Sequence, residues 1–210
     1  MKLNWANRIT ILRMFLIVPF VICMLKTNDG ELTRPVRDAA RYAAFAVFIV
    51  MALSDAFDGW LARSKKQVTH LGAFLDPIAD KLLITCACLL LASHRGKVDG
   101  FDLPVTVVVL IIGKDMFLLI GFTIVYLITS KVRIVPVSAG KAATALQLSM
   151  VAAILVAPEI SGFFDGWIWV LRVLWWSAAA AAVLAMVVYF RAGLRYIEPS
   201  EHNGHTTTNT

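Results

Sequence analysis

Long apolar stretches alternate with short polar or turn-forming breaks along the whole 210-residue chain. Six stretches can be drawn, at about residues 9–25, 37–61, 74–93, 103–128, 139–157 and 167–190. Each is close to the roughly 20 residues that a helix needs to cross a bilayer, and backbone groups in lipid must be hydrogen-bonded within their own segment. The pattern predicts an all-α fold, an integral membrane bundle of six transmembrane helices. We expect one membrane domain at residues 1–197 and a disordered polar tail at 198–210.

Composition agrees with a membrane location. Hydrophobic residues make up 59% of the chain and charged residues only 16%, whereas about a quarter of the residues of soluble domains are charged. The net charge is +6, and the basic residues stand at the ends of apolar stretches. This arrangement favours an anionic lipid surface as the partner and argues against nucleic acid. The three cysteines lie in apolar stretches and have no zinc-site spacing, so we interpret them as core or lipid-facing residues.

Orientation follows from the basic residues in the breaks. An even number of spans places both termini on one side, and nine Lys and Arg residues fall on that side against six on the other. This excess favours termini in the cytoplasm. The first apolar stretch contains Arg13 and is followed by no small-residue cleavage site, so it is expected to be a retained helix. The lack of a transit peptide favours the inner (plasma) membrane of a bacterium, with a multi-pass topology.

Four aspartates interrupt the second and third stretches. Asp55 and Asp58 are three residues apart, and Asp76 and Asp80 are four apart, so each pair shares one face of its helix. The short linker between the two helices predicts that they are antiparallel neighbours, which would bring the four carboxylates into one small volume. A carboxylate at membrane depth is costly unless it is paired or ligated, so such residues indicate function.

The carboxylate cluster predicts a site for one or two hard cations, Mg²⁺ or Mn²⁺, with two as the expectation. Such ions bind phosphates, and a carboxylate near an acceptor can instead take its hydroxyl proton. Gly59 and Gly72 allow a ligand or backbone to come close, and the planar fork of Arg63 suits a diphosphate. A cation transporter could also use such carboxylates, but Arg63, Lys65 and Lys66 suit an anionic substrate better. A third interpretation is a structural protein whose aspartates pair with arginines such as Arg13.

The spacing matches a known pattern. The motif D-x2-D-G-x2-A-R-x8-G-x3-D-x3-D is present with every interval intact, as Asp55, Asp58, Gly59, Ala62, Arg63, Gly72, Asp76 and Asp80. With this motif, the chain resembles the CDP-alcohol phosphotransferase (CDP-alcohol phosphatidyltransferase) family. The segments at 7–13 and 74–82 extend the resemblance, which covers most of residues 5–195.

The resemblance implies a homodimer of six-helix subunits in the bilayer, with a site open to the cytoplasm and to lipid. It implies that Asp55, Asp58 and Asp76 bind metal, and that Asp80 is the catalytic base and a further metal ligand. The implied CDP contacts are Asp55, Asp58, Gly59, Ala62, Arg63, Gly72, Thr10 and Arg13. The implied reaction transfers a phosphatidyl group from CDP-diacylglycerol to a polar alcohol and releases CMP, without a covalent enzyme intermediate.

The acceptor alcohol is less strongly indicated. The start of the first helix resembles the glycerophosphate branch of the family, whose acceptor is glycerol 3-phosphate. The acceptor's phosphate would need cations, for which Lys114, Lys141, Lys131 and Arg133 are the candidates. Lys114 could instead form an internal ion pair with Asp115.

Two other acceptors stay open. The Lys114-Asp115 pair departs from the usual Arg-Glu of the glycerophosphate branch, and the segments 111–115 and 138–148 resemble cardiolipin synthases, whose acceptor is phosphatidylglycerol. Inositol phosphate is a third choice. The small residues 178–182 are suited to close helix packing, with the dimer face as a suggested location.

Overall fold

A computed structural model describes residues 5–65, 70–129 and 138–197, and it describes side chains for residues 11–54, 81–121 and 140–191. These residues form helices and connecting turns, with no strand among them. The helices are α1 (Trp5–Leu25), α2 (Arg34–Lys65), α3 (His70–Leu91), α4 (Val105–Thr129), α5 (Ser138–Leu155), α6 (Ala157–Ser161) and α7 (Trp167–Ile197). The all-α prediction is confirmed, and each of the six apolar stretches coincides with one long helix.

Some helices extend beyond the apolar stretches that predicted them. α2 begins at Arg34, where the stretch begins near residue 37, and it ends at Lys65 instead of near residue 61. At its start the Thr33 carbonyl accepts hydrogen bonds from the amides of Val36 and Arg37, each at 3.1 Å. Pro35 lies in this first turn, where a missing N–H costs nothing. The helix therefore continues into charged sequence at both ends, which apolarity alone does not reveal.

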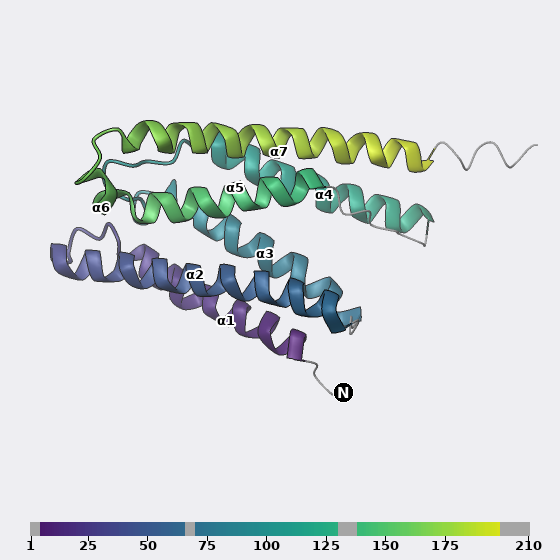
Figure 1. Ribbon diagram of the computed structural model, residues 1–210, viewed down its shortest axis with the longest axis horizontal. Helices are drawn as coiled ribbons and strands as arrows, with labels where there is room; N and C mark the ends of the chain where they lie inside the picture. Colours follow the sequence, from purple (N-terminus) through teal and green to yellow (C-terminus); the bar gives the residue numbers. More distant parts are fainter. Residues whose placement is uncertain (1–4, 66–69, 130–137, 198–210) are drawn as a thin grey trace, which may run out of the picture.

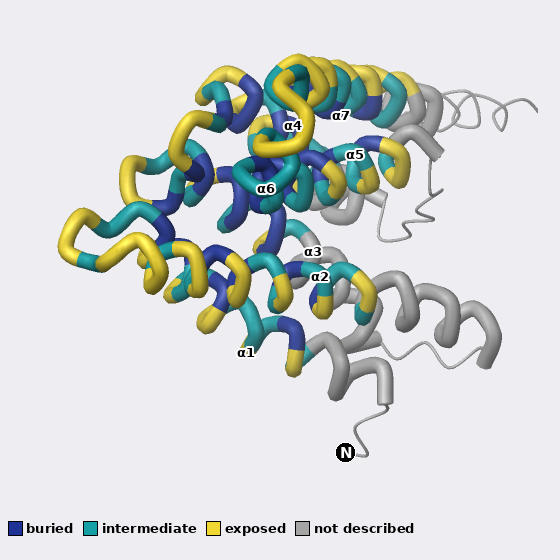
Figure 2. Tube along the Cα trace, turned by 60° about the vertical axis from the view of Figure 1, so that its left-hand side comes forward, coloured by how far each residue is buried: buried dark blue, intermediate teal, exposed yellow. Residues whose placement is uncertain are grey.

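The six long helices run back and forth along the molecule, each opposite in direction to the one before it (Figure 1). α1 packs against both α2 and α3, while α7 packs against both α4 and α5. Contacts of α5 with α2 and α3 join these two groups. α2 and α3, which carry the motif, thus run in opposite directions and share α1 as a neighbour. Buried residues lie mainly where the helices face one another (Figure 2).

The core draws apolar side chains from all six long helices, large ones on α1 and α2 and a row of small ones on α7 among them. Phe20 and Phe48 are buried, with ring centroids 5.9 Å apart. On α7, Ala178, Ala179 and Ala182 are buried within the chain. Small side chains let helices approach closely. Three of the five residues 178–182 therefore pack inside this subunit, and the suggestion that this run forms the dimer face stays a prediction.

Membrane-crossing potential is clear for one helix of the described part. The stretch 167–191 in α7 is long and apolar enough to cross a membrane. The described parts of α1, α3 and α5 contain shorter apolar runs, at residues 11–25, 81–91 and 140–155. The prediction of six transmembrane helices stays a prediction.

Candidate active site

The motif is divided between two helices. Five of its residues lie on α2 and three on α3: Asp55, Asp58, Gly59, Ala62 and Arg63, then Gly72, Asp76 and Asp80. The side chains of all eight lie outside the described residues, as do the side chain of Thr10 and the candidates Lys131 and Arg133. Among the described residues no group of three or more His, Cys, Asp or Glu side chains is placed to hold a metal. The metal site remains a prediction from the donor set, four carboxylates at helical spacing.

Arg13 lies where four helices meet. Its side chain is 1% exposed and lines a small cavity together with residues of α2, α3 and α5, among them Ala52, Leu83 and Thr144. Ala52 stands three residues before Asp55, and Leu83 stands three residues after Asp80. Arg13 is therefore brought to within about one turn of the motif on both helices. The contact of Arg13 with CDP stays a prediction, and its place beside the motif is compatible with it.

A buried ion cluster adjoins the motif on its other side. Lys81, the residue after Asp80, places its Nζ 2.7 Å from Oδ1 of Asp115 on α4, and the Nζ of Lys114 lies 3.0 Å from the same oxygen. The carboxylate is 7% exposed and the Lys114 side chain 2% exposed. Among the described residues neither Asp115 oxygen has hydrogen-bond geometry with a donor, so both contacts are ion pairs. Two cations on one carboxylate give the cluster a net charge of +1.

The acceptor candidates on α4 and α5 lie in different surroundings. Lys114 forms the internal ion pair that was its alternative interpretation. Lys141 is exposed, Thr144 is half-buried and donates to the Gly140 carbonyl at 3.1 Å, and Gln147 is completely buried. Neither amide atom of Gln147 has a hydrogen-bond partner in the described part. The polar row on α5 thus runs from the surface into the bundle.

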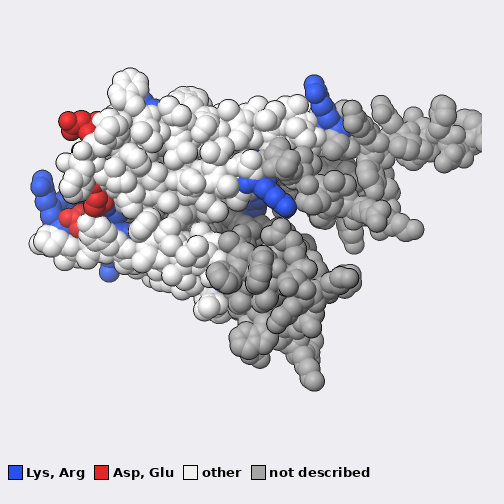
Figure 3. Space-filling view, in the orientation of Figure 1, with Lys and Arg blue, Asp and Glu red and all other residues white. Residues whose placement is uncertain are grey.

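Charged side chains gather at the other end of the molecule as well. Figure 3 shows described Lys, Arg, Asp and Glu atoms at the end where α6 lies, and a largely uncharged surface between that end and the undescribed part. A network at this end joins α2 to α6. Arg41 donates to both carboxylate oxygens of Glu159, at 2.7 and 2.6 Å, and to the Leu155 carbonyl at 2.8 Å, while Tyr42 donates to Glu159 at 2.6 Å.

Comparison with known proteins decides the family. A family model described as "CDP-alcohol phosphatidyltransferase" matches residues 3–188. The chain belongs to the CDP-alcohol phosphatidyltransferase family. The resemblance carried by the motif is thereby confirmed over nearly the whole chain.

Several relatives of this family member have names that state an activity. A "Probable phosphatidylglycerophosphate synthase" of Mycobacterium tuberculosis (strain ATCC 25618 / H37Rv) is 36% identical over 145 residues, which cover 69% of this chain and 62% of that protein. The chain therefore matches less than two thirds of that relative's length. A protein of Bacillus subtilis (strain 168) named "CDP-diacylglycerol--glycerol-3-phosphate 3-phosphatidyltransferase" is 36% identical to this chain, and the match covers 73% of this chain and 77% of that protein. A protein of Rickettsia felis (strain ATCC VR-1525 / URRWXCal2) with the same name is 31% identical, and the match covers 92% of this chain and 97% of that protein.

Lys81 is assigned no role by the sequence analysis. It is the α3 partner of Asp115 and follows Asp80 directly. A signal was present, because a lysine beside the motif and an aspartate inside an apolar stretch each need a partner of opposite charge. The pairing of Arg41 with Glu159 was also missed, since 118 residues separate them.

Proposed function

We propose that the chain transfers the phosphatidyl group of CDP-diacylglycerol to glycerol 3-phosphate, giving phosphatidylglycerophosphate and CMP. Membership of the CDP-alcohol phosphatidyltransferase family supports the reaction type. The names of the relatives are the observation that favours glycerol 3-phosphate over phosphatidylglycerol or inositol phosphate. Family membership also favours transfer over a cation path.

The residues of the motif have separate tasks in this proposal. Asp80 takes the proton of the acceptor hydroxyl. The acceptor oxygen then bonds to the β-phosphorus of the CDP group, the bond from that phosphorus to the bridging oxygen breaks, and CMP leaves with the bridging oxygen. Arg63 and Arg13 bind the diphosphate, because guanidinium forks match phosphate oxygens.

Two divalent cations, Mg²⁺ or Mn²⁺, held by Asp55, Asp58, Asp76 and Asp80, would neutralise charge on the diphosphate and the leaving phosphate. The side-chain-free or small positions Gly59, Ala62 and Gly72 leave room for the cytidine. Thr10, one turn before Arg13 on α1, would complete the CDP contacts. The acceptor's own phosphate needs cations elsewhere, and the exposed Lys141 is a better candidate than Lys114, which is occupied by Asp115.

The bilayer is the proposed setting for all six long helices. The shortest, α5, has 18 residues, which at 1.5 Å per residue is about 27 Å, near the roughly 30 Å of a hydrocarbon core. Large apolar side chains point outward from several helices, including Phe15 at 71% exposed, Val109 at 61% and Leu184 at 60%. A soluble surface rarely exposes so much apolar area.

The motif lies toward the end of the bundle that holds the N-terminus, as the course of α1, α2 and α3 shows (Figure 1). The excess of basic residues on that side favours a cytoplasmic site, where glycerol 3-phosphate would be available. We also propose a homodimer in the inner membrane, as the family resemblance implies. Light scattering of the purified protein in detergent would give its subunit number.

Release of labelled CMP from CDP-diacylglycerol tests the function. The purified protein is assayed in separate tubes with glycerol 3-phosphate, phosphatidylglycerol and inositol phosphate, each with Mg²⁺, with Mn²⁺ or with EDTA. We expect release with glycerol 3-phosphate alone, abolished by EDTA and restored by either metal. Release only with phosphatidylglycerol would make the protein a cardiolipin synthase. Absence of release with all three acceptors, together with ion flux into liposomes, would overturn the proposal.

A further inference from the structure

A second cavity lies at the end of the bundle opposite the motif. It has a volume of about 340 Å³ and is lined by the first turns of α2, by residues 98–99 of the loop before α4, and by Pro158 of α6. Pockets that hold small ligands begin at about 300 Å³. All of its lining residues belong to the described part of the chain, and none belongs to the transfer motif.

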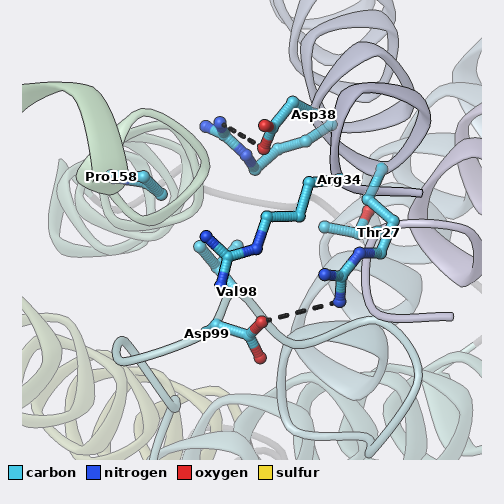
Figure 4. A pocket seen from close by; sticks show the side chains of 8 residues that line it. Thr27, Arg34, Asp38, Val98, Asp99 and Pro158 are labelled. Carbon is cyan, nitrogen blue, oxygen red and sulfur yellow. Dashed lines mark hydrogen bonds and ion pairs between the residues drawn. The ribbon is translucent and has the colours of Figure 1, made fainter. Parts of the chain in front are cut away.

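Three arginines of α2 line this cavity. Arg34, Arg37 and Arg41 are three and four residues apart, so they project from one face of the helix. Figure 4 shows the Arg34 side chain reaching into the middle of the cavity. The cavity is therefore built to receive negative charge.

The three guanidinium groups differ in how many hydrogen bonds and ion pairs they already make within the protein. Arg41 is saturated by Glu159, Asp38 and the Leu155 carbonyl, and thus serves as a scaffold. Arg37 has a buried Nε without a hydrogen-bond partner, and its Nη1 lies 3.9 Å from the Asp99 carboxylate, at the limit of an ion pair. Arg34 makes no hydrogen bond or ion pair in the described part of the chain.

Asp38, Asp99 and Glu159 formally balance the three arginines, but Asp38 and Glu159 both bind Arg41, so of these three carboxylates only Asp99 pairs with Arg37. Asp38 lies 3.3 Å from Arg41 and is 59% exposed, while Asp99 is 67% exposed and only loosely held by Arg37. An exposed ion pair at such a distance is worth little. A ligand with several oxygens could bind Arg34 and Arg37 together and displace Asp99 from Arg37.

Planar guanidinium groups bind the oxygens of a phosphate bidentately, as they bind those of a carboxylate. The same end of the molecule exposes Tyr42 at 51%, next to Arg41 on α2, and Trp169 at 64%, in the first turn of α7. Exposed aromatic side chains beside charged residues are typical of a membrane interface, where phospholipid phosphates lie. We propose that the cavity binds a phosphate group through Arg34 and Arg37, on the opposite side of the bundle from the CDP site.

Calorimetric titration of the full chain in detergent tests this site. The two probes are a short-chain phosphatidylglycerol and inorganic phosphate, which distinguish a lipid headgroup from the free ion. The double variant Arg34→Gln/Arg37→Gln is compared with Lys26→Gln/Arg95→Gln, which removes two exposed cations at the same end outside the cavity. We expect the first variant to bind at least about tenfold more weakly, since hydrogen bonds to charged groups are lost, and the control to bind like the wild type.

A third variant acts in the opposite direction and guards against misfolding of the first. Asp99→Asn removes the carboxylate that competes for Arg37, so it should bind the probe a few-fold more tightly. Three outcomes would each overturn the proposal. They are equal binding by all variants, an equal loss in the cavity variant and the control, and no binding by the wild type. Binding is measured independently of CMP release, so this test can fail while the proposed reaction is correct, and the reverse.

Discussion

Lys81 on α3 and Asp115 on α4 form an ion pair of 2.7 Å, one residue away from the predicted catalytic base Asp80. The Nζ of Lys114 lies 3.0 Å from the same oxygen of Asp115. The pair links α3, which carries three of the eight motif residues, to α4, which carries none of them. Asp115 therefore has a structural task next to the site, because it offsets two cations inside the bundle.

Removing the Asp115 charge should destabilise the protein. In Asp115→Asn the ammonium groups of Lys114 and Lys81 lose their counter-charge, and breaking a buried pair costs about 3 kcal/mol. Thermal unfolding in detergent should show a clearly lower Tm. The matched control is Asp102→Asn, because Asp102 pairs with Lys97 at 3.3 Å but is 63% exposed. Equal Tm values for the two variants would show that the buried cluster is unimportant for stability.

The proposed base can be tested without changing its shape. Asp80→Asn should lower the rate of CMP release by about 10²–10⁴-fold, the usual contribution of a positioned general base. Its Tm should remain at or above that of the wild type, since a carboxylate among carboxylates is lost. Turnover of Asp80→Asn at the wild-type rate would remove Asp80 from the catalytic role.

Stability at the opposite end should depend on pH through Glu159. Hydrogen bonds from Arg41, and a further one from Tyr42, lower the pKa of Glu159 from 4.5 to about 2. A carboxyl whose pKa is lowered by folding stabilises the native state above its unfolded pKa and loses that effect as pH falls. The Tm advantage of the wild type over Glu159→Gln should thus be full at pH 6 and disappear between about pH 4.5 and pH 2. A constant difference across this range would contradict the pairing.

Close packing of α5 against α7 can be tested at Gly140. A Cβ there would lie 2.7 Å from the Tyr189 hydroxyl oxygen and 3.2 Å from its Cε2. Gly140→Ala should therefore cost about 1–3 kcal/mol of overpacking, partly offset by about 1 kcal/mol of helix propensity. In a Tyr189→Phe background the same change should cost less, because the nearest atom is gone. Equal costs in both backgrounds, measured by thermal unfolding, would mean that the two helices are not in this contact.

Sequence periodicity located the helices but not all of their ends. Apolar residues cluster wherever a helix faces lipid or core, so the six stretches marked the six long helices. α2 extends three residues further at its start and four at its end. The Thr33 carbonyl accepts the first amide hydrogen bonds, and Pro35 and the charged residues form regular helix without being apolar. The small size of the alanines at 178–182 predicted close helix packing. Only the fold showed that α7 packs against α4 and α5.

The motif determined the family and the predicted chemistry. Intervals of three and four residues place carboxylates on one face of each helix, and this follows from local helix geometry alone. The family model over residues 3–188 confirmed that inference. The tertiary structure alone decided which distant charges meet: Lys81 with Asp115, Arg41 with Glu159, and the arginines of α2 with the loop at Asp99. These contacts depend on how helices far apart in the chain are packed, and helical spacing carries no information across such separations.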